Sequence, residues 1–561
     1  MSPTTTEEFA LPERALENFG AAVRAAIEEY GRVTSADVPI EAPRRPEFGD
    51  FATSAAFGLA KIVKKSPPEV AAHLVQLLQK SGVLRHELFA AIEPAGGFIN
   101  VRLAPQCWQN SVARILREGK EFGRCGPSGK RISLEFGSAN PTGPLVVVQG
   151  RTLSIGQTLA NAMQARGHFV FTEWIINDEG AQMETLARSL YARYRQATNP
   201  SYPLPEGGYP GEYLIPIARA IRDADGERWE SAPESEWLPH FMKFGRDRIV
   251  AEQEATAKRF GVHYDHWQSE KELHESGRVK ADLERLRERG YTYEQEGALW
   301  FKATRFGDDK DRVLVRSDGR TTYYGADVAY HYEKLQRSDY TIDILGPDHH
   351  GYIGRIRGVA DALGHKDQLD VLISQQITLM RGREQVSMSK RAGNIVTLDE
   401  IIDEVGVDAA RFFFVMLAPD QPLKFDLELA KEQSNNNPVF YVQYGHARIA
   451  SVFKNAAASD VDDAARGATL EKLEHPAELA LARRLDEFPR VVAATVEQLA
   501  PQRLSHYARE VASDFHQFYT HCRILEQDRD TRLARLGLSI AAQQVLASVL
   551  GLIGVSAPTS M

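Results

Sequence analysis

Two short segments of the chain carry residue types that suit phosphate chemistry. Residues 135–145, Glu-Phe-Gly-Ser-Ala-Asn-Pro-Thr-Gly-Pro-Leu, lie between a strand-like run and a helix-like run. The unpaired N–H groups and partial positive charge of a helix N-terminus favour a phosphate at such a loop. Residues 386–394 carry Lys390 and Arg391 in a Ser- and Gly-rich stretch, and two cations can neutralise charge that develops during nucleotidyl transfer. Taken singly, each segment also fits an ordinary surface loop.

The elements around these segments alternate between strand and helix patterns. Helix-like runs at 153–165 and 182–195 separate runs that are rich in β-branched and aromatic residues. This order predicts an α/β fold in which helices cover a parallel sheet, and such sheets bind ligands beyond the carboxyl ends of their strands. The strand-like runs that we assign to this part of the fold are 131–136, 168–176, 313–316, 340–345 and 369–379.

Changes in composition divide the chain into three expected domains. Residues 1–125 combine helical periodicity with an alternating strand at 98–103, which predicts an α+β domain. Residues 126–435 hold the strand–helix alternation, interrupted at about 196–295 by a charged helical insertion. Residues 436–561 are helical throughout, so we expect a separate all-α domain there.

Composition narrows the class of protein. The 561 residues carry a formal net charge of −9, unlike the strongly basic surface of a non-specific nucleic-acid binder. The cysteines Cys107, Cys125 and Cys522 show no Cys-x-x-Cys spacing, which argues against a structural zinc site. No run reaches the roughly 18 uninterrupted apolar residues of a membrane helix, and the polar start does not fit a secretory signal. We therefore expect a cytoplasmic protein with no membrane partner and no metal site.

Together, the two phosphate-suited segments resemble class I aminoacyl-tRNA synthetases, which have a phosphate-binding loop after the first strand and a Lys-Met-Ser-Lys loop after the last. Five further segments sharpen the resemblance to the arginyl-tRNA synthetase family. It then implies an N-terminal tRNA-contacting domain, a Rossmann-type catalytic domain with a parallel sheet, and an anticodon-binding C-terminal domain. The five segments are residues 43–52, 96–100 (Gly-Gly-Phe-Ile-Asn), 176–180 (Ile-Asn-Asp-Glu-Gly), 441–448 and 554–561.

The resemblance implies an arginine site. A planar guanidinium needs carboxylates in fixed geometry, a role that the resemblance gives to Asp327. Tyr323, one helical turn earlier, would line the same pocket, and Glu135 and Asn140 would hold the α-amino end. His349, in the run Asp348-His-His350, would touch the substrate. By type alone, Tyr323 also fits a packed aromatic, Asp327 a surface charge and His349 a core histidine.

The resemblance also implies that the partners are L-arginine, ATP as its Mg2+ complex and the tRNA specific for arginine, bound by a monomer. Lys390, Gln149 and Arg391 would act on the reacting phosphates. The implied ATP-binding residues are Ser138, Ala139, Pro141, Thr142, Gly143, Pro144, Gln149, Gly150, Met388, Ser389 and Lys390. Tyr441, Tyr444, Phe518 and Tyr519 would stack on anticodon bases, although aromatics at helical spacing also fit a core.

Two departures from the family pattern bear on catalysis. Val146-Val-Val-Gln149 stands where the family has His-x-Gly-His, and Ser387 stands where its lysine loop begins with lysine. Gln149 can donate a hydrogen bond as a histidine would, and Arg151 and Arg391 are cations near the two loops. We therefore expect an active arginine–tRNA ligase. The alternatives are a catalytically weakened tRNA-binding paralogue, and a nucleotidyltransferase with a small-molecule acceptor.

Overall fold

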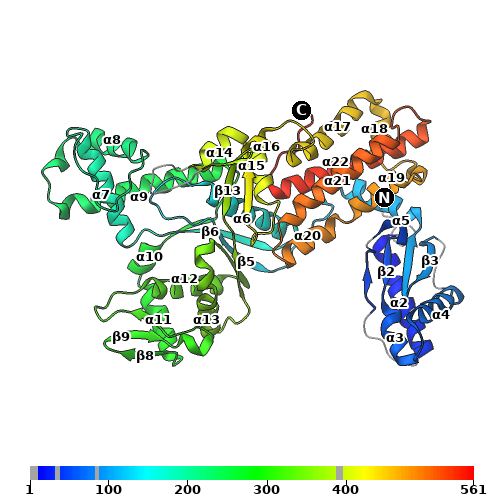
Figure 1. Ribbon diagram of the computed structural model, residues 1–561, viewed down its shortest axis with the longest axis horizontal. Helices are drawn as coiled ribbons and strands as arrows, with labels where there is room; N and C mark the ends of the chain where they lie inside the picture. Colours follow the sequence, from blue (N-terminus) through cyan, green and yellow to red (C-terminus); the bar gives the residue numbers. More distant parts are fainter. Residues whose placement is uncertain (1–10, 32–37, 44, 83–86, 387–395) are drawn as a thin grey trace.

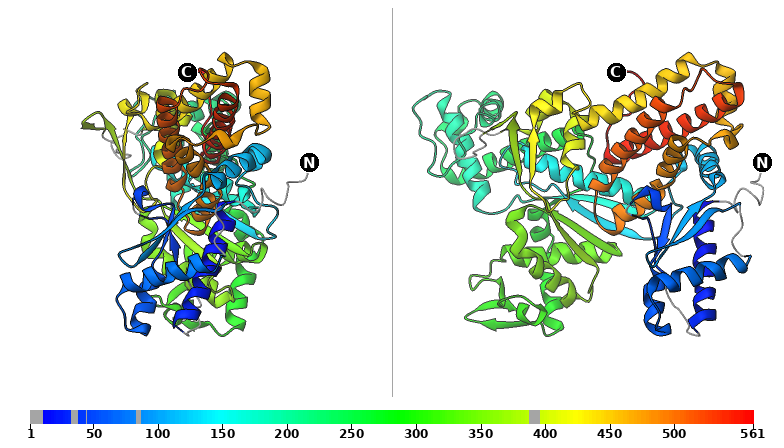
Figure 2. Two further views of the ribbon diagram at one scale, coloured as in Figure 1. Left: turned by 90° about the vertical axis from the view of Figure 1, so that its right-hand side faces the viewer. Right: turned by 45° about the vertical axis from the view of Figure 1, so that its right-hand side comes forward.

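The computed structural model describes residues 11–31, 38–43, 45–82, 87–386 and 396–561 (Figure 1). The views agree on an elongated molecule with a parallel sheet near its middle (Figures 1 and 2). Helices α7–α9 extend from one end of the molecule. The C-terminal helices and the N-terminal domain lie at the other end.

The central sheet has five parallel strands in the order β12-β11-β5-β6-β7. Its middle strand is buried from Ile132 to Phe136, as expected for a parallel strand that is covered on both faces. The sequence predicted this strand with the bounds that the structure has. The strands are β5 (Arg131–Phe136), β6 (Phe169–Ile176), β7 (His266–Ser269), β11 (Tyr340–Leu345) and β12 (Leu369–Ile373).

Two of the expected strand assignments are wrong in detail. Residues 313–316 do not join the central sheet, because β10 (Arg312–Val315) pairs with β9 (Ala298–Phe301) in a separate antiparallel sheet that β8 (Thr292–Gln295) completes. The run 369–379 is also divided. Its first residues form β12, and its last residues begin β13 (Ile377–Arg381). Strand β13 pairs with β14 (Glu384–Gln385) and β15 (Leu423–Asp426).

The N-terminal domain is an antiparallel sheet in the order β1-β2-β4-β3 with three helices packed on it. Ser66 and Glu69 form a reciprocal capping box at the start of one of these helices, where two prolines also favour helix entry. The strands are β1 (Ile40–Glu41), β2 (Phe51–Thr53), β3 (Phe89–Ala95) and β4 (Phe98–Leu103). The helices are α2 (Pro12–Gly31), α3 (Ala55–Val63) and α4 (Pro67–Lys80), and α5 (Pro105–Glu118) leads to the central sheet.

Helices surround the central sheet and build the insertion. The insertion has its own aromatic core, in which Tyr191 stacks on Trp237 with ring centroids 3.9 Å apart. The insertion helices are α7 (Ala181–Gln196), α8 (Leu214–Asp225) and α9 (Glu234–Arg259). The others are α6 (Val147–Ala165), α10 (Glu270–Glu275), α11 (Arg278–Glu288), α12 (Tyr323–Arg337), α13 (Ile353–Leu363), α14 (Leu398–Val405), α15 (Val407–Phe414) and α16 (Leu427–Lys431).

The C-terminal domain is helical, as the sequence predicted. Its last helix, Arg529–Ile553, is by length and composition apolar enough to span a membrane. However, 67% of the apolar 18-residue stretch of this helix is buried inside the protein. This helix packs against α18 and α21, so its apolar residues form the domain core. The helices are α17 (Pro438–Asn455), α18 (Ala458–Ala465), α19 (Pro476–Asp486), α20 (Phe488–Glu497), α21 (Gln502–His521) and α22 (Arg529–Ile553).

Candidate active site

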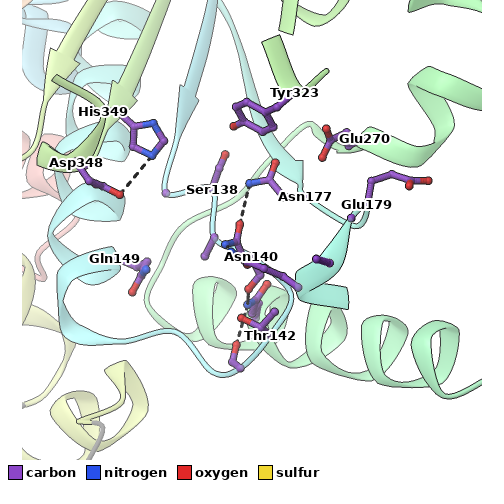
Figure 3. A pocket seen from close by; sticks show the side chains of 18 of the residues that line it. Ser138, Asn140, Thr142, Gln149, Asn177, Glu179, Glu270, Tyr323, Asp348 and His349 are labelled. Carbon is purple, nitrogen blue, oxygen red and sulfur yellow. Dashed lines mark hydrogen bonds and ion pairs between the residues drawn. The ribbon is translucent and has the colours of Figure 1, made fainter. Parts of the chain in front are cut away.

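A cleft of about 1310 Å³ opens at the carboxyl edge of the central sheet (Figure 3). The loop after β5 and the start of α6 line one side, and the start of α12 lines another. The loop after β11, with His349, and the segment after β6, with Asn177 and Glu179, complete it. This is where ligands bind in open α/β sheets, because successive loops meet at that edge.

The loop after β5 is fixed by the insertion. Gln253 of α9 donates from its amide to the carbonyls of Asn140, at 3.1 Å, and Gly143, at 2.8 Å. The hydroxyl of Tyr213 donates to the carbonyl of Thr142 at 2.5 Å. Gly137 begins the loop with a φ of 80°, and a Cβ there would lie 2.6 Å from Leu153. The loop is therefore held in one shape before any substrate binds.

The loop leads directly into α6, whose first turn faces the cleft. Gln149 accepts a hydrogen bond from the backbone N–H of Val146 through its side-chain oxygen, at 3.1 Å. Among the described residues, none accepts a bond from its amide nitrogen, which is left to donate to a ligand. Ser138, Ala139, Thr142, Gly143 and Pro144 also line the cleft, together with Gln149.

Three expectations about this region need correction. Pro141 and Gly150 are buried and do not line the cleft, and Gly150 is small because Leu398 and Phe414 pack over it. Arg151 is not a phosphate contact. Its buried guanidinium donates to the carbonyls of Gln375 and Ala418, each at 3.0 Å, and so ties α6 to neighbouring segments.

Beside Tyr323, the cleft-lining carboxylate of Glu270 has a second carboxylate near it, that of Asp327, which lies one helical turn after Tyr323 and does not itself line the cleft. Asp327 accepts a hydrogen bond from the hydroxyl of Tyr352, and burial raises its pKa to about 6. Glu270 is 7% exposed, and burial together with the charges of Asp327, Asp178 and Glu179 raises its pKa to about 7. Two carboxylates that are costly to ionise together form a site that favours a cationic ligand.

Asp178 holds Glu270 in place. Its carboxylate accepts from the Ser269 hydroxyl at 2.8 Å, from the backbone N–H of Lys271 at 3.0 Å and from Arg246 at 2.8 Å. These bonds fix the first turn of α10, on which Glu270 stands. The segment 176–180 therefore lines the cleft and also stabilises the first turn of the helix that carries Glu270.

Three parts of the chain match protein-family models. Residues 17–103 match the arginyl tRNA synthetase N terminal domain, residues 239–415 match the tRNA synthetases class I (R) catalytic domain, and residues 442–561 match the DALR anticodon binding domain. An arginine–tRNA ligase of Syntrophotalea carbinolica is 42% identical over 559 residues, covering 98% of this chain and all of the relative. The chain belongs to the arginyl-tRNA synthetase family. The family and the fold class expected from the sequence are confirmed.

Solved structures share the arginyl-tRNA synthetase fold. A structure from Campylobacter jejuni described as an arginyl-tRNA synthetase has 29% identity and a TM-score of 0.76, covering 82% of this chain and 100% of its own. The Thermus thermophilus arginyl-tRNA synthetase has 22% identity and a TM-score of 0.75, covering 97% of this chain and 100% of its own.

The cleft of this arginyl-tRNA synthetase collects most of the expected arginine-site residues. Asn140 lines the cleft, and its side-chain amide is fixed at both groups, because it donates to Gln182 at 2.7 Å and accepts from Asn177 at 2.9 Å (Figure 3). Tyr323 is 53% exposed and borders the cavity, which excludes the packed-aromatic alternative. His349 also lines the cleft, with its ring 3.6 Å from Asp348. The core-histidine alternative is therefore excluded.

Glu135 does not line the cleft, contrary to expectation. It is 5% exposed, and its oxygens accept from Ser138, at 2.9 Å, and from Lys334, at 2.7 Å. Ser138 stands between this carboxylate and the cavity. Glu135 is therefore not placed to contact the α-amino group of the substrate directly. It acts on the site through Ser138.

The lysine loop, with Met388, Ser389, Lys390 and Arg391, lies outside the described residues. Its downstream end is described and lies beside the start of α6. Thr397 forms a β-bridge with Val146, and the N–H of Leu398 donates to the carbonyl of Leu145 at 2.8 Å. The chain that follows the lysine loop is therefore bonded to Leu145 and Val146, the two residues that lead into α6.

In the C-terminal domain, three of the four expected aromatic platforms lie near one basic side chain. The guanidinium of Arg448 lies 4.7 Å from the ring centre of Tyr444 and 4.9 Å from that of Tyr519. The ring of Tyr441 lies tilted against that of His516, with centroids 4.9 Å apart, and His516 is 3.5 Å from the guanidinium of Arg448. Phe518 is fully buried, so it is a core residue and not a stacking platform.

The sequence analysis missed Glu270, Asn177 and Gln182. Asn177 lies in the segment 176–180 that the resemblance had singled out, so its motif was a usable signal. Glu270 had no such signal. It follows the four-residue strand β7, within the residues 196–295 that the sequence analysis expected to be a helical insertion. Only the pairing of β7 with β6 brings Glu270 to the cleft.

Proposed function

We propose that the protein joins L-arginine to the tRNA specific for arginine in two steps. In the first, a carboxylate oxygen of arginine attacks the α-phosphorus of ATP, and pyrophosphate leaves. In the second, a terminal ribose hydroxyl of the tRNA attacks the carbonyl carbon of arginyl-adenylate, and AMP leaves. Catalysis then consists of positioning and charge stabilisation, since no step needs a covalent bond to the protein.

One observation carries this proposal. A single cleft is lined by the Glu270 carboxylate, with Asp327 close behind it, at one end and by a phosphate-suited loop with a helix N-terminus at the other. A cationic amino acid lying between them presents its own carboxylate toward the nucleotide. Charge-assisted hydrogen bonds to a guanidinium are among the strongest polar contacts in proteins, which suits arginine as the substrate.

At the guanidinium end, Asp327 and Glu270 provide the negative charge and Tyr323 forms a wall. Asn140 is placed for the α-amino end, since its amide is already oriented by Gln182 and Asn177. His349 lines the cleft near the start of α13 and contacts the bound substrates. Glu135 supports this arrangement indirectly, by orienting Ser138.

At the phosphate end, the first-turn N–H groups of α6 and the Gln149 amide bind ATP phosphates. ATP enters as its Mg2+ complex, so the metal is part of the substrate. Among the residues that the structure describes, no group of three His, Cys, Asp or Glu side chains is arranged to hold an ion. Lys390 and Arg391 neutralise charge on the departing pyrophosphate, while Met388 and Ser389 border the adenine.

The tRNA contacts are proposed for the C-terminal surface of Tyr441, Tyr444 and Tyr519, where the exposed ring of Tyr519, the two half-buried rings and Arg448 can stack on unpaired bases. Activation of arginine is expected to require bound tRNA, as in the family. We place the enzyme in the cytoplasm as a monomer.

Arginine-dependent exchange of pyrophosphate into ATP, measured with and without tRNA, tests the proposal. Exchange that needs both arginine and its tRNA supports it. Absence of exchange with tRNA still bound in a gel-shift assay would favour the tRNA-binding paralogue. Exchange driven by another acceptor, without a tRNA effect, would favour a small-molecule nucleotidyltransferase. A Lys390→Ala variant with full exchange activity would remove the role given to the lysine loop.

A further inference from the structure

Three buried carboxylates stand side by side across the central sheet. Glu173 of β6 is in register with Glu135 of β5, which is in register with Asp343 of β11. Their exposures are 0%, 5% and 1%. Like charges on neighbouring strands repel, and a buried carboxylate is costly unless it is paired. We call these three residues the acid row.

Three basic side chains of helix α12 bond to the acid row. Lys334 bonds to Glu135, with its Nζ 2.7 Å from the carboxylate, and also to Asp343. His331 lies 2.9 Å from the second oxygen of Asp343, and Arg337 pairs with Glu173. Three-residue spacing on a helix places these side chains close to one face.

Lys334 stands at the middle of a bonded path between Ser138, which lines the cleft, and Asp327, which lies one helical turn after the cleft residue Tyr323. On one side, Glu135 accepts from Ser138 at 2.9 Å, and Ser138 lines the loop end. On the other side, Lys334 bonds to Asp343, and Asp343 bonds to His331. His331 then bonds through its second ring nitrogen to the backbone carbonyl of Asp327 at 2.7 Å. Every link of this path is a hydrogen bond or an ion pair.

The cation of Lys334 is retained although the side chain is fully buried. Burial lowers the pKa of a lysine, but the charges of Asp343 and Glu135 outweigh this effect and leave the pKa above its ordinary value. The lysine is therefore a permanent charge and not a group that titrates near neutrality.

We propose that Lys334 is a positioning residue that fixes the distance between Ser138 and Asp327, and with it the length of amino-acid side chain that the site accepts. This inference rests on the proposed function, because it takes those two residues as the ends of the arginine site. Lys334 itself touches no substrate. It acts by holding strands β5 and β11 and helix α12 at one separation.

Arg337 provides a matched control. It lies on the same helix and pairs with the same acid row, but the described side-chain bonds of its partners Glu173 and Ser133 reach no cleft residue, whereas Glu135 accepts from Ser138. Lys334→Met and Arg337→Met each remove one cation from this row and leave an unbranched side chain. A purely structural role predicts similar effects of the two changes, whereas a positioning role predicts that only Lys334→Met alters substrate selection.

The full-length variants are compared in the tRNA-dependent exchange reaction, using arginine and its homologue with one more methylene. For Lys334→Met we expect a rise of about tenfold or more in the KM for arginine, a change of about twofold or less in the KM for ATP, and a several-fold loss of preference for arginine over the homologue. For Arg337→Met we expect lower thermal stability and an unchanged ratio of the two KM values.

Equal KM ratios and equal preferences in the two variants would overturn the inference. If Lys334→Met does not fold, His331→Gln interrupts the same path while leaving Lys334 bonded to both acids. It should raise the KM for arginine by a smaller factor in the same direction, and an unchanged KM would again overturn the inference. Absence of arginine-dependent exchange in the unaltered protein would overturn the proposed function, and this inference with it.

Discussion

Glu270 lines one end of the cleft and Asp327 lies close to it on a different element, so that the charge of Asp327 adds to burial in raising the pKa of Glu270 to about 7. Glu270 begins α10, whereas Asp327 lies in the second turn of α12. A guanidinium between them would be paired twice and would relieve their mutual repulsion. This relationship underlies the proposed choice of substrate.

Arginine affinity should therefore depend on pH. The pKa of Asp327 is raised to about 6 and that of Glu270 to about 7, so both are partly protonated in the free protein at acidic pH. Their raised pKa values contribute stability to the free fold that is lost as pH rises through these values, and a bound guanidinium offsets that loss. The increase in melting temperature caused by arginine should be larger at pH of about 8 than at about 6.

Calorimetric titration of arginine over the same pH range gives the affinity directly. Glu270→Gln should flatten the dependence, because the amide does not titrate in this range. An affinity that does not change between these pH values in the unaltered protein would contradict the assignment of the pair to the guanidinium.

Asp327→Asn should weaken arginine binding without disturbing ATP. The loss of one charge-assisted contact, worth about 1.5–3 kcal/mol, corresponds to a rise in the KM for arginine of roughly tenfold to hundredfold. Glu333→Gln is the control. It removes a carboxylate from the same helix, where Glu333 pairs with Arg278 outside the cleft. Equal KM values in the two variants would show that the Asp327 charge does not bind substrate.

Gln253→Met should loosen the loop after β5. The change removes both bonds to the carbonyls of Asn140 and Gly143, each worth about 0.5–1.5 kcal/mol. We expect a several-fold rise in the KM for ATP in the exchange assay and a modest fall in melting temperature. The neighbouring exposed residue provides the control Glu254→Gln, which should behave like the unaltered protein. A variant of Gln253 with normal ATP kinetics would mean that the loop keeps its shape without the insertion.

Tyr519→Ala should weaken tRNA binding. The ring is 40% exposed beside Arg448, and stacking of one base on an aromatic ring is worth about 1–3 kcal/mol. The KM for tRNA in aminoacylation should rise by roughly tenfold, with arginine and ATP affected little. Gln517→Ala, an exposed change on the same helix, should leave all three values unchanged. If the two variants behave alike, the tRNA contacts lie elsewhere on this domain.

Local patterns predicted the central elements well. The strand 131–136 is specified by alternating polar and apolar residues, and the turn into the following helix by Gly and Pro, signals that act within a few residues. The strand at 313–316 was assigned to the wrong sheet, because alternation reveals a strand but not its partner. The same limit applies to the run 369–379, which is shared between two sheets.

Side-chain direction was the second limit. Residue type alone made Arg151 a possible phosphate contact and Phe518 a possible stacking platform. The folded chain buries both, since each lies on a helix face turned toward neighbouring elements. Glu135 was expected to hold the α-amino end of the substrate, but its carboxylate is bonded within the protein and does not line the cleft.

The sequence by itself determined the family, the α/β class and the loop that leads into α6, because these depend on motifs that are continuous along the chain. Only the tertiary structure decided which acids form the cation site and which cations neutralise the acid row. Glu270 reaches Asp327, and Lys334 reaches both Glu135 and Asp343, through strand order and helix packing. Electrostatic partners are chosen by distance in space, and no local pattern records the distance between residues far apart in the chain.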